Sequence, residues 1–155
     1  MLNSAVNSKT HSEDQTGPNE AKLKEFQFKL IHRIVVTKKE LFRFGIKPDH
    51  DECLYCGDKD SIEHTFIECP FTKIFVQKVV QWFNETNSFQ ISPTVEEVLF
   101  GIISNSHETK IKRKFNYTTL SMRKYIYSNK INSETISIHE FINKLPFNYN
   151  LENIN

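Results

Sequence analysis

Apolar residues recur at helical spacing along most of the chain, whereas the alternating pattern of a half-buried strand is absent. The first such segment predicts an amphipathic helix over residues 21–35 with a basic outer face. Its apolar positions are Leu23, Phe26, Leu30, Ile31 and Ile34. Thr37 and Glu40 form a capping-box pair that opens a second, short helix. The apolar and stop positions of that helix are Leu41, Phe44, Gly45 and Pro48.

Four further helices are predicted in the second half of the chain. A third apolar stripe runs from Pro70 to about Asn84, at Phe71, Ile74, Phe75, Val79, Trp82 and Phe83. Ser92 and Pro93 then form an N-cap and first-turn pair for a helix that Gly101 ends, with Val95, Val98, Leu99 and Phe100 as its apolar positions.

The last two helices are predicted over residues 109–131 and from residue 137 onward. The first is long and basic, although Asn116, Thr118 and Thr119 are poor helix formers. Ser137 with Glu140 repeats the capping-box pattern before the final helix, which Pro146 closes.

At 155 residues the chain has room for one domain with a modest core. Residues 1–20 are rich in Asn, Ser, Thr and Asp, and we expect them to be a disordered tail. The folded domain is predicted over residues 21–147, with a frayed tail over residues 148–155. There is no apolar run long enough to cross a bilayer and no signal-peptide pattern. We therefore expect an intracellular protein of the nucleus or cytoplasm, neither secreted nor in a membrane.

All three cysteines lie within seventeen residues, in the pattern C-x2-C-x7-H-x4-C formed by Cys53, Cys56, His64 and Cys69. Thiols confined to one cluster, with a histidine at ligand spacing, indicate a metal site and not a disulfide framework. Three thiolates and one imidazole fill a tetrahedral shell and leave no position for water or substrate, so we predict one structural Zn²⁺. We expect a mostly α fold whose short helices pack around this metal module, residues 49–70.

Local signals place the ligands on different elements. Ser61 is a candidate N-cap for a short helix through Glu68 that carries His64. That helix has to end before Cys69, because Pro70 disfavours the α conformation at the residue preceding it. Gly57 suits a tight turn around the metal, since glycine tolerates positive φ.

Two alternatives to this ligand set stay open. The cysteines could be small buried apolar side chains, as free cysteines often are. His50, three residues before Cys53, is a weaker rival of His64 for the fourth position, and choosing it would leave Cys69 without a reason.

The net charge is only +1, but its distribution is uneven. Residues 21–47 hold eight Lys or Arg against two Glu, and residues 107–131 hold seven against one, so each segment carries +6. Residues 48–70 hold seven acids against one Lys, which gives −6. Because Zn²⁺ with three thiolates carries a formal charge of −1, we expect any phosphate contact on the helices around the metal module.

These residues together resemble a known family. The stretch 26–34, followed by Thr37, Leu41, Gly45 and Ile46, the cysteine and histidine pattern, and residues 62–66, is similar to the zinc-binding region that follows the reverse transcriptase in non-LTR retrotransposon polyproteins. The likeness continues at residues 99–101 and 123–127 and covers roughly residues 20–145. It implies a nucleic-acid-binding module that holds template RNA or target DNA near a polymerase, with Cys53, Cys56, His64 and Cys69 as the family ligands. A paired-aspartate polymerase motif is missing from the chain.

The leading hypothesis is binding of RNA or DNA with little sequence preference, through two basic patches. The first patch consists of Lys22, Lys24, Lys29, Arg33, Lys38, Lys39 and Arg43. The second consists of Lys110, Lys112, Arg113, Lys114, Arg123 and Lys124. Tyr55 is the candidate in the metal loop for stacking on a base, and packing over the metal is at least as good an interpretation of it.

Other classes of function are also considered. The acidic metal module could dock on a basic protein partner, such as a reverse transcriptase polypeptide. The chain could also be a retrotransposon remnant without a selected role. A nucleophile beside a base and a catalytic carboxylate constellation are both missing from the sequence, so we expect neither an enzyme nor a small-molecule substrate.

Overall fold

The computed structural model describes residues 18–46, 50–103 and 108–145. Its helices are α1 (Pro18–Ile31), α2 (Lys38–Arg43), the π-helix η1 (His64–Glu68), α3 (Pro70–Asn87), α4 (Val95–Phe100), α5 (Thr109–Ile131) and α6 (Ile138–Lys144). Within these ranges no strand forms, and extended backbone pairs only at one antiparallel bridge between Glu52 and Lys59. The prediction of a mostly α fold is confirmed.

The predicted ends of the domain fare differently. Residues 1–17 of the expected N-terminal tail lie outside the described residues, as do Pro48 and residues 146–155. The boundary at residue 20 is wrong, because α1 already begins at Pro18, a residue suited to the first helical position. None of the helices in the described ranges combines the length and the apolar composition needed to cross a membrane.

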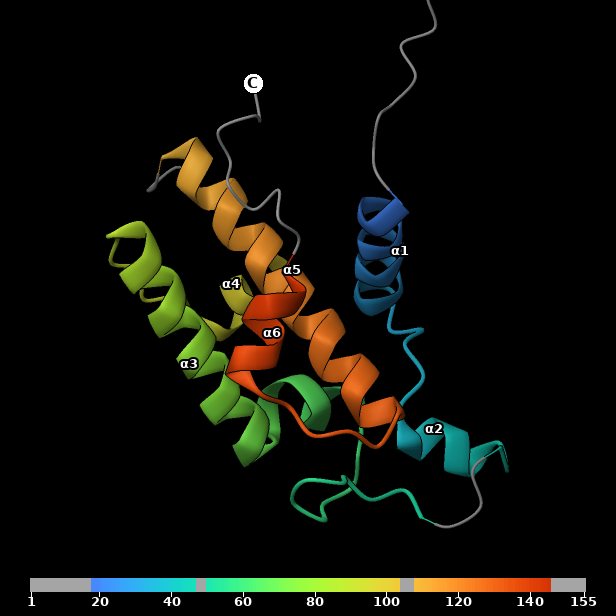
Figure 1. The fold of residues 1–155 in the computed structure, drawn as a ribbon. Helices are drawn as coiled ribbons and strands as arrows, with labels where there is room; N and C mark the ends of the chain where they lie inside the picture. The colour runs from blue at the N-terminus through green and yellow to red at the C-terminus, as the bar shows by residue number, and fades with distance from the viewer. Residues whose placement is uncertain (1–17, 47–49, 104–107, 146–155) are drawn as a thin grey trace, which may run out of the picture.

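Helix α5 is the central element. Figure 1 shows it running diagonally across the molecule, between α1 on one side and α3 on the other. Its residues take part in all three apolar clusters of the core. The first is formed by Phe75, Val79, Val98, Met122, Tyr125, Ile126 and Phe141, the second by Phe26, Leu30, Val35, Phe66 and Leu99, with Leu120 and Tyr127 packed against it, and the third by Phe83, Ile91, Ile102 and Phe115.

The predicted bounds of α5 are confirmed although its middle holds poor helix formers. Asn116 clamps the backbone of Ile102, since the Ile102 amide donates to Asn116 Oδ1 at 2.7 Å and Asn116 Nδ2 donates to the Ile102 carbonyl at 3.1 Å. The Thr118 hydroxyl donates to the Lys114 carbonyl at 2.8 Å. These side chains therefore stabilise tertiary structure or satisfy themselves inside the helix, which offsets their low propensity.

Several helices end in the same way, with a residue of positive φ just past the helix. Arg33 (φ 55°), Gly45 (φ 69°), Ser88 (φ 50°) and Ser133 (φ 59°) hold this position after α1, α2, α3 and α5. In each case the next amide donates to a carbonyl five residues back, as Ile34 does to Lys29 at 2.9 Å, which is the Schellman arrangement. Only Gly45 carries the glycine signal. For this reason α1 ends at Ile31 and not at residue 35, and α3 continues to Asn87 and not to Asn84.

Seven apolar residues predicted to face the core are exposed: Ile31, Ile34, Phe44, Phe71, Ile74, Val95 and Phe100. Most of them lie at or beyond a helix end, where the helical phase of the pattern no longer applies. After α1 ends, Val35 enters the second core cluster in place of Ile34. In α3 the first turn buries Thr72 and Phe75, so Phe71 and Ile74 face outward.

The predicted caps are confirmed only in part. Thr37 and Glu40 form the expected capping box, with the Thr37 amide donating to the Glu40 carboxylate at 3.0 Å. The cap of α4 is Thr94 and not Ser92, because Glu97 stands three residues after Thr94 and completes a capping box there. Helix α6 begins at the predicted place, but its Glu140 carboxylate accepts from the Tyr125 hydroxyl at 3.1 Å instead of closing a box with Ser137.

The left-handed conformation of Ser88 leads to a stability prediction. Replacing Ser88 by Gly should raise the free energy of unfolding by about 0.5–1 kcal/mol, because glycine has no Cβ to oppose positive φ. Ser88→Ala keeps the Cβ and is the matched control, for which we expect no gain. Denaturant unfolding of the three proteins measures the difference, and equal stabilities of the Gly and Ala variants would contradict the assignment of this helix end.

Candidate metal centre

The loop between the first two cysteines folds back on itself. The Gly57 amide donates to the Cys53 carbonyl at 2.9 Å, and the Tyr55 amide donates to Cys53 Sγ at 3.4 Å. Gly57 has a φ of 84°, which confirms the positive φ predicted for it. The bridge between Glu52 and Lys59 closes the base of the loop, so Cys53 and Cys56 present their sulfurs to the same side.

The other two residues of the pattern lie on and directly after η1. Ser61 caps this turn as predicted, since the His64 amide donates to Ser61 Oγ at 3.1 Å. Cys69 leaves the α region at ψ 121°, as Pro70 requires. The Cys69 amide donates to the His64 carbonyl at 3.0 Å, five residues back. In an ideal α-helix residues five apart point about 140° away from each other. The wider π turn brings the two side chains together.

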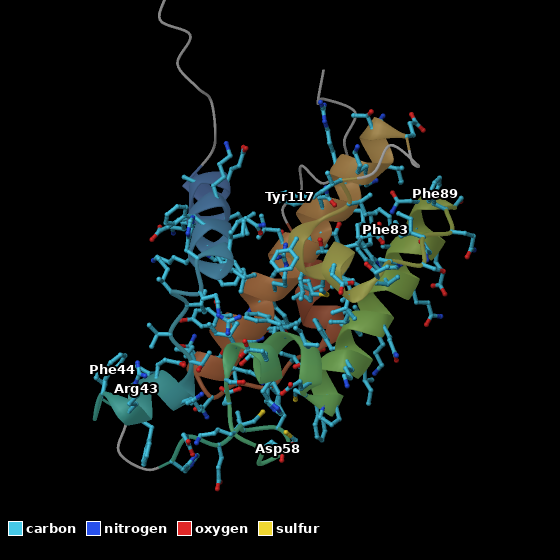
Figure 2. The ribbon with its side chains drawn as sticks, turned by 180° about the vertical axis from the view of Figure 1, so that it is seen from behind. Arg43, Phe44, Asp58, Phe83, Phe89 and Tyr117 are labelled. Atoms are coloured by element: carbon cyan, nitrogen blue, oxygen red, sulfur yellow. The ribbon has the colours of Figure 1, made fainter. Side chains whose placement is uncertain are left out.

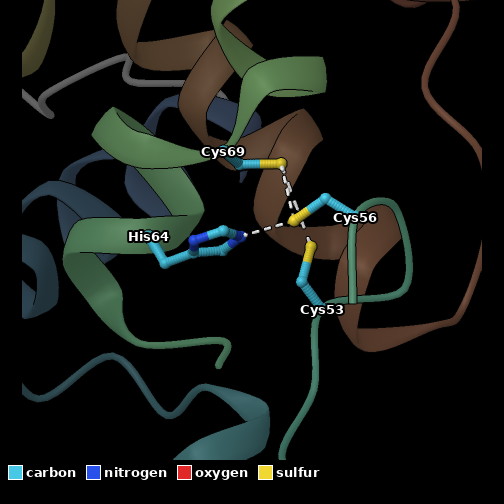
Figure 3. A group of neighbouring side chains, drawn as sticks. All are labelled: Cys53, Cys56, His64 and Cys69. Carbon is cyan, nitrogen blue, oxygen red and sulfur yellow. Dashed lines mark hydrogen bonds between the residues drawn. The ribbon is translucent and has the colours of Figure 1, made fainter. Parts of the chain in front are cut away.

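The four side chains converge, as Figure 3 shows. Their ligand atoms all lie within 4.8 Å of one another. Cys53 Sγ is 3.9 Å and Cys56 Sγ 4.0 Å from Cys69 Sγ, and His64 Nε2 is 3.2 Å from Cys56 Sγ. A tetrahedral zinc site with usual bond lengths has sulfurs about 3.8 Å apart and nitrogen about 3.5 Å from sulfur. The cluster is therefore compatible with one zinc ion.

The same distances decide between the alternatives. The three cysteines are free, and sulfurs almost 4 Å apart are far beyond disulfide length. Four ligand atoms turned toward a common centre are not explained by cysteines that merely fill the core. His50 is exposed and does not belong to the cluster.

The thiols differ in their electrostatic surroundings. Burial disfavours the Cys69 thiolate, but the backbone amides of Thr72 and Phe71 at the start of α3 and the charge of Lys130 outweigh it and lower the pKa of Cys69. Burial and the neighbouring Cys53 and Cys69 raise the pKa of Cys56 to about 12. Without metal, the cluster therefore retains at least one thiol proton at neutral pH.

Lys130 is a residue of this site that the sequence analysis missed. It lies in the last turn of α5, and its Nζ is 3.3 Å from Cys53 Sγ and 3.1 Å from Asp60 Oδ1. Asp60 is also buried, and it accepts from the Thr65 hydroxyl at 2.8 Å. Helical periodicity gives no signal for this contact, because a lysine so far along the chain is ordinarily part of a solvated face.

Tyr55 packs against the metal module. Its hydroxyl donates to the Glu134 carbonyl at 2.7 Å, and Lys130 Nζ lies 5.4 Å from the centre of its ring. The half-buried ring therefore serves as a lid between the loop and the end of α5, which favours packing over base stacking.

Two of the predicted nucleic-acid contacts are placed inside the protein. Lys38 is 7% exposed and Arg123 is 2% exposed, so neither can meet a phosphate. Arg123 Nε donates to the Thr119 carbonyl at 3.1 Å, and burial lowers the pKa of its guanidinium to about 10. The exposed members are Lys22, Lys24, Lys29, Arg33, Lys39, Arg43, Lys110 and Arg113, and the half-buried ones are Lys112, Lys114 and Lys124.

The two basic segments meet in space. Lys22 and Lys29 from α1 and Lys124 from α5 line a cavity of about 240 Å³ between these helices. Lys22 and Lys124 also line a neighbouring cavity of about 320 Å³, together with Lys144 of α6. We call the lysines Lys22, Lys29 and Lys124 with their cavity the α1–α5 groove.

A comparison with protein families supports the metal interpretation. A family described as zinc-binding in reverse transcriptase matches residues 9–75, which include α1, α2 and the whole cysteine and histidine cluster. The match confirms the family resemblance over this span. Comparisons with curated proteins and with solved structures found no match.

Metal analysis tests the site directly. We expect one zinc ion per chain and loss of helical circular dichroism when a chelator removes it, because a structural metal contributes its binding energy to folding. Cys69→Ser should weaken zinc binding by more than the about 10- to 100-fold cost of an outer-sphere change. His50→Ala should leave zinc binding unchanged. Zinc retained in Cys69→Ser but lost in His50→Ala would contradict the assigned ligands.

Zinc affinity should also depend on pH. Because the pKa of Cys56 is raised to about 12, zinc has to displace its proton anywhere between pH 6 and pH 8. Each displaced proton strengthens binding about tenfold per pH unit, so affinity rises with pH and falls on acidification. Chelator competition at pH 6, 7 and 8, corrected for the chelator's own protonation, measures this slope. A flat profile would show that the thiols are not the ligands.

Proposed function

We propose that this chain, whose residues 9–75 belong to the zinc-binding family of reverse transcriptases, is a module in which one zinc ion holds helices that bind RNA or DNA. The metal supplies no catalysis in this proposal, because three thiolates and an imidazole leave it no open position. This agrees with a family description that names zinc binding alone.

The α1–α5 groove is the observation that carries the proposal. Its lysines come from segments about a hundred residues apart in sequence, and the fold gathers them around one cavity. Lys29 is paired with Glu25 at 2.5 Å, but both groups are exposed, so a phosphate can compete for the lysine at little cost. A row of cations beside a cavity is what a phosphodiester backbone requires for binding without sequence preference.

Exposed aromatic rings near these cations support the same proposal. Phe28 on α1 and Phe42 on α2 are exposed, as is Phe44 just past α2. Figure 2 shows Arg43 and Phe44 together at the end of α2, where the guanidinium lies 4.9 Å from the ring centre. Bases of a single strand stack on such rings while nearby cations meet the phosphates. The arrangement favours single-stranded nucleic acid over a duplex.

A protein partner is the second candidate, and a specific observation favours it. Ile31, Ile34 and Ile46 are exposed beside the same aromatic rings, and aliphatic side chains of this size usually mark a protein contact. A reverse transcriptase polypeptide is the partner that the family suggests. Docking through the acidic metal module has less support, because Asp51, Asp60 and Glu63 are paired with Lys59, Lys130 and Arg33 inside the chain.

Removing charges from the groove tests nucleic-acid binding. The double variant Lys29→Gln and Lys124→Gln should weaken binding to single-stranded RNA or DNA uniformly across sequences. It should also reduce the slope of log K against log salt by about two, one for each lost phosphate contact. Fluorescence anisotropy at several salt concentrations measures both quantities.

The matched control is Lys73→Gln with Lys78→Gln, which removes the same charge from exposed positions on α3. We expect this control to keep nearly all of its affinity. If both double variants lose affinity equally, net charge and not the groove governs binding. If the unmodified protein binds neither RNA nor DNA but is retained by a reverse transcriptase polypeptide, the second candidate replaces the first.

A further inference from the structure

Lys130 brings a charge into the protein interior beside the metal-ligand cluster. Its side chain is 2% exposed, and both of its close partners, Asp60 and Cys53, belong to the metal module. A buried lysine is strongly unfavourable unless charged partners surround it with good geometry. The structure meets that condition only because residues of the metal module supply the partners.

We propose that Lys130 completes the metal centre from outside the matched family segment, by donating one N–H to the Cys53 thiolate and another to Asp60. This inference rests on the zinc site proposed above. Lys130 is a positioning residue, because it contacts no metal and acts through a ligand. Outer groups of this kind fix ligand orientation and tune the donor atoms of many metal sites.

The local charges support the assignment. A zinc ion with three thiolates and a neutral imidazole carries a formal charge of −1, and the buried Asp60 carboxylate adds another negative charge beside it. Lys130 lies within 3.3 Å of both groups and offsets one of these two charges. Without it, the loaded centre would hold two uncompensated negative charges away from water.

The hydrogen bonds around Asp60 extend the network to the other ligands. The Thr65 hydroxyl donates to Asp60 Oδ1 at 2.8 Å, and Thr65 directly follows His64 in η1. Cys53 Sγ also accepts from the Tyr55 amide. One buried lysine therefore contacts a thiolate of the loop and a carboxylate that is bonded to the helix of the histidine ligand.

A second link fastens the same two parts of the chain. The Tyr55 hydroxyl donates to the Glu134 carbonyl at 2.7 Å, three residues past the end of α5, and the Tyr55 ring lies beneath Lys130. The end of α5 is thus held to the metal loop at two points. Zinc occupancy and the position of α5 should be coupled, although α5 lies entirely outside the residues that match the family.

Zinc and cobalt binding test the role of Lys130. Lys130→Met removes the charge and the donors, and we expect zinc affinity, measured by chelator competition, to fall about 10- to 100-fold. In the cobalt-loaded protein, the thiolate-to-metal charge-transfer band should shift to lower energy, because a thiolate that loses a hydrogen bond gives up an electron more easily. Lys130→Arg should retain most of the affinity and the band position. Lys78→Met, at an exposed position of α3, is the control and should change neither.

The outcomes separate this inference from the zinc proposal. An unmodified protein that binds no zinc overturns both. Zinc binding by the unmodified protein with unchanged affinity and cobalt spectrum in Lys130→Met overturns the role of Lys130 alone.

If Lys130→Met does not fold, amine acetylation of the unmodified zinc-loaded protein decides the question. Lys130 should react far more slowly than the exposed Lys78, and chelation of the zinc should make it reactive. Equal rates for the two lysines in the loaded protein would overturn the inference.

Discussion

The arrangement of three sulfurs and one nitrogen around a common point depends on the backbone between His64 and Cys69. Two of the ligands come from a tight loop and can reach the site easily, but the other two follow each other through a helical turn. An α turn would point them apart, and the π turn closed by the Cys69 amide brings them together. Pro70 then fixes Cys69 outside the helix and starts α3 at once. The direction of α3, and with it the first core cluster, follows from the same turn that positions the ligands.

Helix α5 connects this centre with the rest of the molecule. Its middle is packed in the core, its C-terminal turn carries Lys130 to Cys53, and its outer face contributes Lys124 to the groove. A metal that holds the loop and η1 therefore also holds the helix that forms one side of the proposed binding groove. This connection gives the metal a role in binding without any contact between the metal and nucleic acid.

Much of the fold was predictable because local chemistry determines it. The bounds of α5, the cap of α2 and the positive φ of Gly57 follow from apolar spacing, a capping box and a glycine. The ends of α1 and α3 were missed, since Arg33 and Ser88 take the left-handed conformation without a glycine to signal it. The ligand set could be named from spacing alone, whereas the π turn and Lys130 could not. A π turn has no sequence signature of its own, and Lys130 reaches the site only through the tertiary packing of α5.

Charge is the property for which sequence segments mislead most. The metal module counts −6 in sequence, yet three of its acids neutralise cations within the fold, and one of these, Asp60, is buried. Of the basic residues, Lys38, Arg123 and Lys130 are buried and add nothing to the surface. The field that a partner meets is therefore set by the cations that stay outside and by where the helices bring them. Packing α1 against α5 concentrates Lys22, Lys29 and Lys124 in one groove, and a nearly neutral chain acquires a local cationic surface.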